Sequence, residues 1–142
     1  MRKPSERYEQ GRARQAELGE DGVRERAYDL LADIAPDLSR MAVEFAYGDV
    51  HSRPGLDAAR RELVILGVLI ALGATEPQIE AHLGSALAAG LTPGELVEAV
   101  IQTVPYAGFP RTLAAMFVAR RLFEARGLLP VRPASVHTDQ GE

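Results

Sequence analysis

Polar groups that can move protons lie inside the most apolar stretch of this chain, between residues 60 and 110. Glu62 follows Arg60 and Arg61 at the start of an apolar run, His82 lies in the next predicted helix, and Tyr106 lies in a turn rich in Gly and Pro. A carboxylate, an imidazole and guanidinium groups beside apolar surface indicate acid–base chemistry on a small anion, without a cofactor. The chain has no cysteine, which excludes thiol redox chemistry and thiolate metal sites.

His82 is the first candidate for the catalytic acid–base group. It shares the i, i+3, i+4, i+7, i+8 pattern of the apolar residues Ile79, Leu83, Ala86 and Leu87, so the imidazole belongs to the buried face of its helix. A buried imidazole is suited to change charge near neutral pH. The alternative is a core histidine bonded to one backbone carbonyl. No metal site is predicted, because no second His stands four residues away.

Glu62 is the second candidate. An Arg-Arg-Glu run at a helix start is typical of a solvated first turn, but apolar residues begin at Leu63, so one of these side chains must approach the interior. Desolvation would raise the pKa of a carboxyl group at such a place and suit it to proton transfer. Both interpretations stay open from the sequence.

Further candidates for substrate contacts lie in a predicted loop over residues 48–55 and in the turn after the sixth helix. Arg53 and Arg61 are candidates to bind carboxylates, because a guanidinium pairs with a carboxylate through two hydrogen bonds. His51 and Tyr106 are candidate hydrogen-bond donors, with Tyr106 also a catalytic candidate, and Phe109 is a candidate pocket wall. The plain alternative for both aromatic residues is packing.

Periodicity and capping signals predict an all-helical fold of six to seven helices, and no strand pattern stands out. Asp57 and Thr92 are predicted N-caps, and Thr75 with Gln78 has the spacing of a capping box. The helix that begins at Asp57 is apolar on nearly every side, so it is expected to be covered all round. The predicted helices are residues 5–18, 21–35, 36–47, 57–72, 75–90, 92–104 and 111–126.

Size and charge restrict the classes of protein. The 142 residues fit a single helical domain over residues 1–127, followed by a flexible tail over 128–142. The net charge of −4 and the acidic residues Glu95 and Glu98 on the helix after Gly90 argue against nucleic-acid binding and a helix-turn-helix regulator. The longest apolar run is about half of the roughly 20 residues that cross a bilayer, and no signal peptide is seen. We therefore expect a cytoplasmic protein with no membrane contact.

Several of these segments resemble the carboxymuconolactone decarboxylase family. The likeness covers about residues 5–127, including Arg7-Tyr8-Glu9-Gln10-Gly11 near the N-terminus. The matching pieces are residues 47–50 (YGDV), 52–57 (SRPGLD), 61–63 (REL), 80–82 (EAH), 86–90 (ALAAG) and 106–110 (YAGFP). The resemblance implies an all-helical fold, assembly into trimers or hexamers, and a site lined by the helix that carries His82.

The chain departs from the family pattern at residues expected near the substrate. The peroxidase-like branch has two cysteines where Thr75 and Gln78 stand, so this chain resembles the decarboxylase branch. That branch usually has Trp where this chain has Tyr47 and His51, and a second His near Gln102. These differences leave the identity of the substrate open.

The resemblance implies decarboxylation of a small carboxylated lactone of the 4-carboxymuconolactone type, through an enolate and without a cofactor. His82 and Glu62 would move the proton, and the partner is a small molecule. The same groups would suit a cofactor-free isomerase, cyclase or lactone-processing enzyme of a biosynthetic pathway. A third possibility is a non-catalytic helical assembly module.

Overall fold

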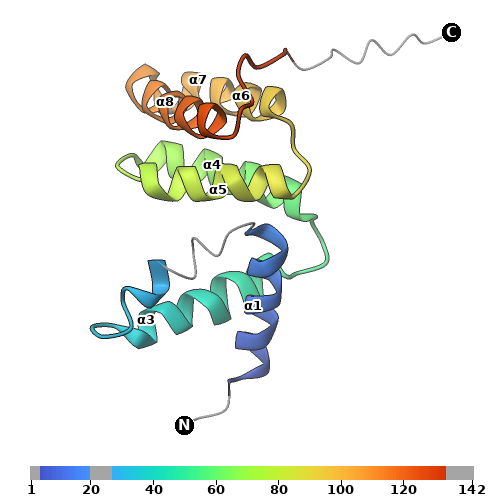
Figure 1. Ribbon diagram of the computed structural model, residues 1–142, viewed down its shortest axis with the longest axis vertical. Helices are drawn as coiled ribbons and strands as arrows, with labels where there is room; N and C mark the ends of the chain where they lie inside the picture. The colour runs from blue at the N-terminus through green and yellow to red at the C-terminus, as the bar shows by residue number, and fades with distance from the viewer. Residues whose placement is uncertain (1–3, 20–26, 134–142) are drawn as a thin grey trace, which may run out of the picture.

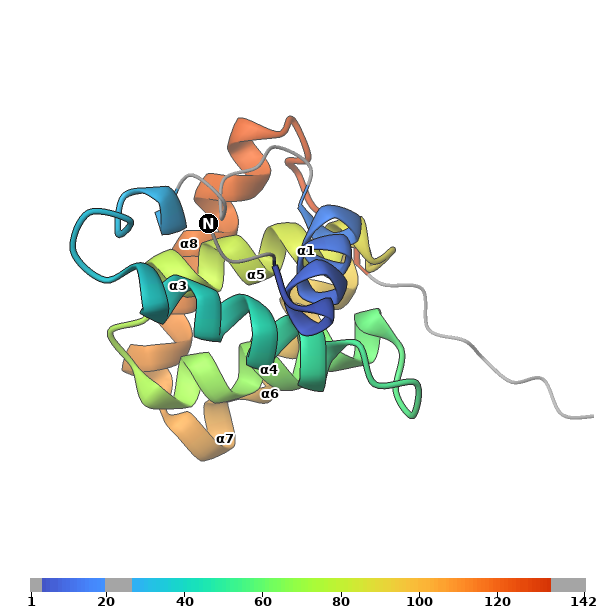
Figure 2. The ribbon, with the colours of Figure 1, turned by 90° about the horizontal axis from the view of Figure 1, so that it is seen from below.

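A computed structural model describes residues 4–19 and 27–133. These residues form helices and turns and contain no strand, which confirms the predicted all-helical class. Figure 1 shows three layers stacked along the long axis of the molecule. The first layer holds α1 (Glu6–Leu18), α3 (Pro36–Met41) and the π-helix η1 (Ala42–His51); the second holds α4 (Ala58–Leu72) and α5 (Glu76–Ala88); the third holds α6 (Pro93–Gln102), α7 (Val104–Ala107) and α8 (Phe109–Ala125). Figure 2 looks along the long axis from below, so that α1 and α3 of the first layer are nearest to the viewer.

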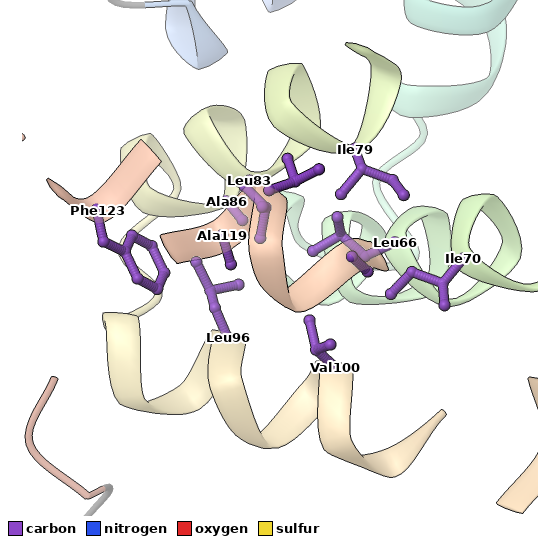
Figure 3. Close-up of a cluster of buried hydrophobic side chains, with 11 residues drawn as sticks. Leu66, Ile70, Ile79, Leu83, Ala86, Leu96, Val100, Ala119 and Phe123 are labelled. Atoms are coloured by element: carbon purple, nitrogen blue, oxygen red, sulfur yellow. The ribbon is translucent and has the colours of Figure 1, made fainter. Parts of the chain in front are cut away.

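The hydrophobic core lies between the second and third layers, where α4, α5, α6 and α8 bring their apolar faces together (Figure 3). Leu83 and Ala86 of α5 are fully buried there, as the periodicity around His82 predicts. The other core residues are Leu66, Ile70, Ile79, Leu96, Val100, Ala115, Val118, Ala119 and Phe123. This core fixes α4 and α5 against each other and so sets the relative positions of Glu62 and His82.

One face of α4 is bare, and the prediction of a helix covered all round is wrong for the single chain. Leu66 and Ile70 are buried, whereas Val64, Val68 and Leu72 are 60%, 54% and 65% exposed. These three residues are spaced four apart, so they form a stripe on the side of α4 that faces away from the core. We call them the α4 stripe.

Two of the three predicted caps are present. The Asp57 side chain accepts a hydrogen bond from the Arg60 N–H, and Thr92 forms a complete capping box with Glu95. The capping box at Thr75 is wrong, because the Thr75 hydroxyl donates to the Leu69 carbonyl at 2.7 Å instead. Thr75 thus satisfies the end of α4 rather than the beginning of α5.

The helices before residue 52 differ from the prediction. Of the helix predicted over residues 21–35, residues 27–29 are helical and residues 30–34 form a turn, while residues 20–26 lie outside the described part. The helix predicted to end near Tyr47 continues as η1 to His51. Gly48 lies inside η1, where a Cβ would collide with the Arg7 carbonyl of α1. The predicted loop begins only at Ser52.

The first residues of the C-terminal segment after α8 pack against the hydrophobic core. Leu128, Leu129 and Val131, which belong to the expected flexible tail, pack against the core. Residues 134–142 lie outside the described part of the chain. None of the described helices has the length and apolarity needed to span a bilayer.

Helix α1 lies against η1 through two glycines. A Cβ on Gly11 would overlap the Val43 carbonyl, just as one on Gly48 would overlap that of Arg7. We expect Gly11→Ala to destabilise the fold by about 1–3 kcal/mol, because the obstacle is backbone and α1 must move away from η1. Thermal unfolding measures this. Gly67→Ala in α4 is the control, because nothing lies within 4 Å of its added Cβ; equal losses in both variants would contradict the close contact.

An ion pair also joins these two helices. The Arg7 guanidinium lies 2.9 Å from Oδ1 of Asp49 and lowers the pKa of that carboxyl group, mainly through their hydrogen bond. Because the pKa is lower in the folded state, the pair stabilises the fold above the ordinary pKa of an aspartate, and this contribution is lost as the pH falls through the folded value. We expect Asp49→Asn to lose less stability than the wild type between pH 6 and about pH 3. Urea unfolding across this pH range checks it, and parallel curves would contradict it.

Candidate active site

Glu62 lies at the centre of a buried hydrogen-bonded cluster. Its side chain is 0% exposed. Its Oε1 lies 3.0 Å from Nε2 of His51, and its Oε2 lies 2.8 Å from Nδ1 of His82. We call these three residues the Glu62 cluster. One carboxylate therefore joins two imidazoles that are 31 residues apart in the sequence.

Three elements position the cluster. His51 is the last residue of η1, Glu62 lies in the first half of α4, and His82 lies in the middle of α5. The solvated interpretation of Glu62 is therefore wrong. His82 lies on the apolar face as expected, with its side chain 15% exposed, but its partner is a carboxylate rather than only a backbone carbonyl.

Contacts around His51 fix the orientation of its ring. The imidazole stacks on Tyr47, with ring centroids 5.8 Å apart and planes inclined by 25°. The Arg14 guanidinium donates to the His51 carbonyl at 3.1 Å, and the Ser52 hydroxyl donates to the Tyr47 carbonyl at 2.6 Å. Ser52 is thus held away from the imidazole. The ring of His51 is 4% exposed and has little freedom to turn.

The chemistry of the cluster follows from its donors and acceptors. An ionised carboxylate only accepts hydrogen bonds, so His51 donates from Nε2 and His82 donates from Nδ1. A buried carboxylate is costly unless it is paired, and two N–H donors with one added proton give a cluster that is neutral overall. Such a group can take up a proton whose charge the carboxylate compensates, and after release of the proton the carboxylate keeps both N–H donors.

A pocket of about 330 Å³ adjoins the cluster at His51. It lies where η1, the loop after it and the first half of α4 meet. Two of its eight lining residues are polar, His51 and Arg61, and the other six are Phe45, Ala46, Val50, Leu56, Val64 and Ile65. A buried acid–base cluster next to a small apolar chamber is an arrangement suited to catalysis on a small molecule.

Comparison with known proteins shows the family of this chain. The sequence model of the carboxymuconolactone decarboxylase family matches residues 36–121, which include the whole Glu62 cluster. The chain belongs to this family. The resemblance seen in the sequence is thereby confirmed.

Two relatives of this family member are named decarboxylases. A 4-carboxymuconolactone decarboxylase of Acinetobacter baylyi is 39% identical over 126 residues, which are 88% of this chain and 92% of the relative. A nitrosuccinic acid decarboxylase of Metarhizium robertsii is 36% identical over 81 residues, which are 57% of this chain and 56% of the relative. A third relative, an uncharacterized 15.0 kDa protein of Paracoccus denitrificans, is 32% identical over 91 residues, 63% of this chain and 68% of the relative.

The two arginines expected to bind carboxylates are placed differently in this family member. Arg61 lines the pocket, and its Nε and one terminal nitrogen donate to the carbonyls of Leu56 and Arg53, both at 2.8 Å. It therefore closes the loop over residues 53–56 as well as bringing a positive charge to the pocket. The Arg53 side chain is exposed and does not line this pocket.

Tyr106 and Phe109 are not brought to the Glu62 cluster within the chain. Their side chains are 89% and 66% exposed, on α7 and at the start of α8 in the third layer (Figure 1). Neither residue lines the pocket beside His51. Within residues 4–19 and 27–133, no group of three or more His, Asp or Glu side chains is arranged to hold a metal ion.

The pairing of His51 with Glu62 was not predicted from the sequence. The Gly, Pro, Asp and Ser content of residues 48–55 predicts a loop, and His51 lies in that range. The close contact between Gly48 and α1 is a tertiary feature that a single sequence does not reveal. The spacing from Tyr47 to His51, four residues, was the available signal for a helix that brings both rings to one side.

Proposed function

We propose that this family member is a cofactor-independent decarboxylase that acts on a small carboxylated lactone of the 4-carboxymuconolactone type. The observation that carries the proposal is the buried Glu62 carboxylate, bonded to two imidazoles beside a small pocket. The names of the Acinetobacter and Metarhizium relatives support decarboxylation as the reaction class.

The reaction needs no external electron sink. When the bond to the carboxylate breaks, carbon dioxide leaves and the electron pair passes through the ring alkene to the lactone carbonyl, giving an extended enolate. The enzyme must bind the substrate, stabilise the enolate oxygen and deliver one proton to carbon. Each preorganised donor to such an oxygen contributes roughly 3–4 kcal/mol to the transition state.

The residues of the site suit these steps. One of the two imidazoles bonded to Glu62 supplies the proton, either His82, the first candidate from the sequence, or His51. Arg61 offers the positive charge that binds a carboxylate retained in the product. Cover of the exposed pocket residues Phe45 and Val64 by a second copy would exclude water from the six apolar residues of the pocket, which would strengthen the electrostatic interactions of these groups with the guest.

The apolar lining favours a second candidate function. A dicarboxylate would find one arginine and one histidine in the pocket formed by the single chain. An isomerase, cyclase or lactone-processing enzyme that passes through an enolate would need only the imidazoles, the carboxylate and an apolar chamber. The same acid–base cluster would then move a proton between two carbons of a less charged substrate.

An assay of carbon dioxide release from 4-carboxymuconolactone separates the two candidates. If the protein is this decarboxylase, we expect one molecule of carbon dioxide for each molecule of lactone consumed. The product made in D₂O should carry one deuterium atom from the solvent. Exchange of deuterium into an uncharged butenolide, with no carbon dioxide from the lactone acid, would contradict decarboxylation and support the second function.

We also propose that the protein works as a homo-oligomer, a trimer or a hexamer. The α4 stripe supports this, because Val64, Val68 and Leu72 expose more than half of their side chains and Val64 borders the pocket. Monomeric proteins rarely leave large apolar patches in water. Cover by a second copy would also complete the wall of the pocket.

A further inference from the structure

We propose that His51, through its Nδ1, is the residue that exchanges a proton with the molecule in the pocket, and that His82 is a positioning residue that acts through Glu62. The proposal rests on the proposed function for the reaction, but its structural part stands on the contacts of His51 and on the pocket that His51 lines. It gives a catalytic role to a position where the resembling branch usually has Trp.

Contacts at the ring and at the backbone carbonyl hold His51 in place. Nε2 is bonded to Glu62, the carbonyl accepts from Arg14, and the ring rests on Tyr47. Nδ1 is buried and has no hydrogen-bond partner among the described residues. Since buried nitrogen atoms are nearly always bonded, an unpaired one on a ring held this firmly points to a ligand or an ordered water.

The position of the pocket decides which histidine meets the guest. His51 forms part of the wall of the 330 Å³ pocket, and His82 is not among its lining residues. Arg61 lines the same pocket. A guest that pairs one carboxylate with Arg61 would place its remaining atoms among apolar side chains and beside the His51 ring. The ligand class is a small, flat acid with one retained carboxylate and an apolar body.

The proton balance fits this assignment. In the charged state His51 holds Nε2–H against Glu62 and carries a second proton on Nδ1. When carbon dioxide leaves, the electron pair of the broken bond passes into the enolate, and the Nδ1–H bond breaks as the new C–H bond forms. His51 is left neutral with Nε2–H still on Glu62, and a proton from water restores the charge after the product leaves.

His82 then has a different task. Its Nδ1–H holds the second oxygen of Glu62 and so orients the carboxylate toward His51. We expect His82→Asn to keep a large part of kcat, because an amide N–H can replace the Nδ1–H donor. His51→Gln should lower kcat by roughly 10²–10⁴ with a KM changed less than the rate, because an amide cannot carry the proton.

The direct test uses the wild-type protein labelled with ¹⁵N and titrated with 2-furoate, a five-membered ring with one carboxylate. The three histidines of the chain are assigned by single substitution. We expect the Nδ1 resonance of His51 to shift with saturation while its Nε2 stays protonated, and the His82 nitrogens to move much less. A larger response at His82, or no response at His51 up to the solubility of 2-furoate, would overturn the proposal.

The titration keeps this inference separate from the proposed reaction. A His51 response in a protein that releases no carbon dioxide from 4-carboxymuconolactone would refute the reaction and leave the role of His51 standing. Carbon dioxide release that His51→Gln leaves unchanged would refute the role of His51 and leave the reaction standing. The proposed reaction and the proposed role of His51 can therefore be refuted independently of each other.

Discussion

Glu62→Gln is expected to lower the rate of carbon dioxide release by roughly 10²–10⁴ and to leave the helical fold intact. The amide has nearly the shape of the carboxylate, so the packing at this fully buried position is kept. However, its nitrogen can only donate, so one of the two imidazoles loses its acceptor and must change tautomer. The negative charge that stabilises a protonated imidazole is lost as well. Steady-state kinetics and circular dichroism together measure the outcome.

Glu80→Gln is the matched control for this substitution. Glu80 lies on α5, two residues before His82, but its carboxylate is 3.8 Å from the Arg121 guanidinium on the surface. Surface ion pairs of this kind contribute little, so activity and stability should both stay near wild type. Full activity in Glu62→Gln would show that the buried carboxylate has no part in proton transfer.

Val68→Asp is expected to split the assembly into single chains. Val68 is the central residue of the α4 stripe and is 54% exposed in the single chain. If a second copy covers the stripe, burial of each of these side chains contributes up to about 1.5–3 kcal/mol, and a carboxylate in their midst would be desolvated without a partner. Sedimentation velocity of both proteins shows whether the mass falls to 15.4 kDa.

Val68→Thr provides the control, because it keeps the shape of the side chain and adds no charge. It should remain assembled, with at most a modest rise in the dissociation constant. A wild-type protein that sediments as a single chain, or a Val68→Asp variant that keeps the wild-type mass, would place the contact between copies elsewhere.

The sequence was sufficient for the features that depend on local pattern. The apolar spacing around His82 gave the buried face of α5, and Asp57 and Thr92 marked the starts of α4 and α6. These features depend on residues within one or two helical turns. The burial of Glu62 could not be predicted in this way. The first turn of its helix is charged, and the partners that bury it come from η1 and α5.

Features that depend on contacts between distant segments were not visible. Gly48 was predicted to lie in a loop, but it lies inside η1 and allows α1 to approach this helix closely. Thr75 looked like the first residue of a capping box but donates to the end of α4. The bare face of α4 was also hidden, since an apolar helix gives no sign of whether its cover comes from the same chain.

The central claim is that the Glu62 cluster acts as one proton-transfer unit. The most direct measurement is the rate of carbon dioxide release by the wild type, Glu62→Gln, His82→Ala and the double variant Glu62→Gln/His82→Ala. Residues that act as a unit have strongly non-additive effects. We predict that the double variant is about as slow as the slower single variant. A double variant whose loss equals the product of the two single losses would contradict the account.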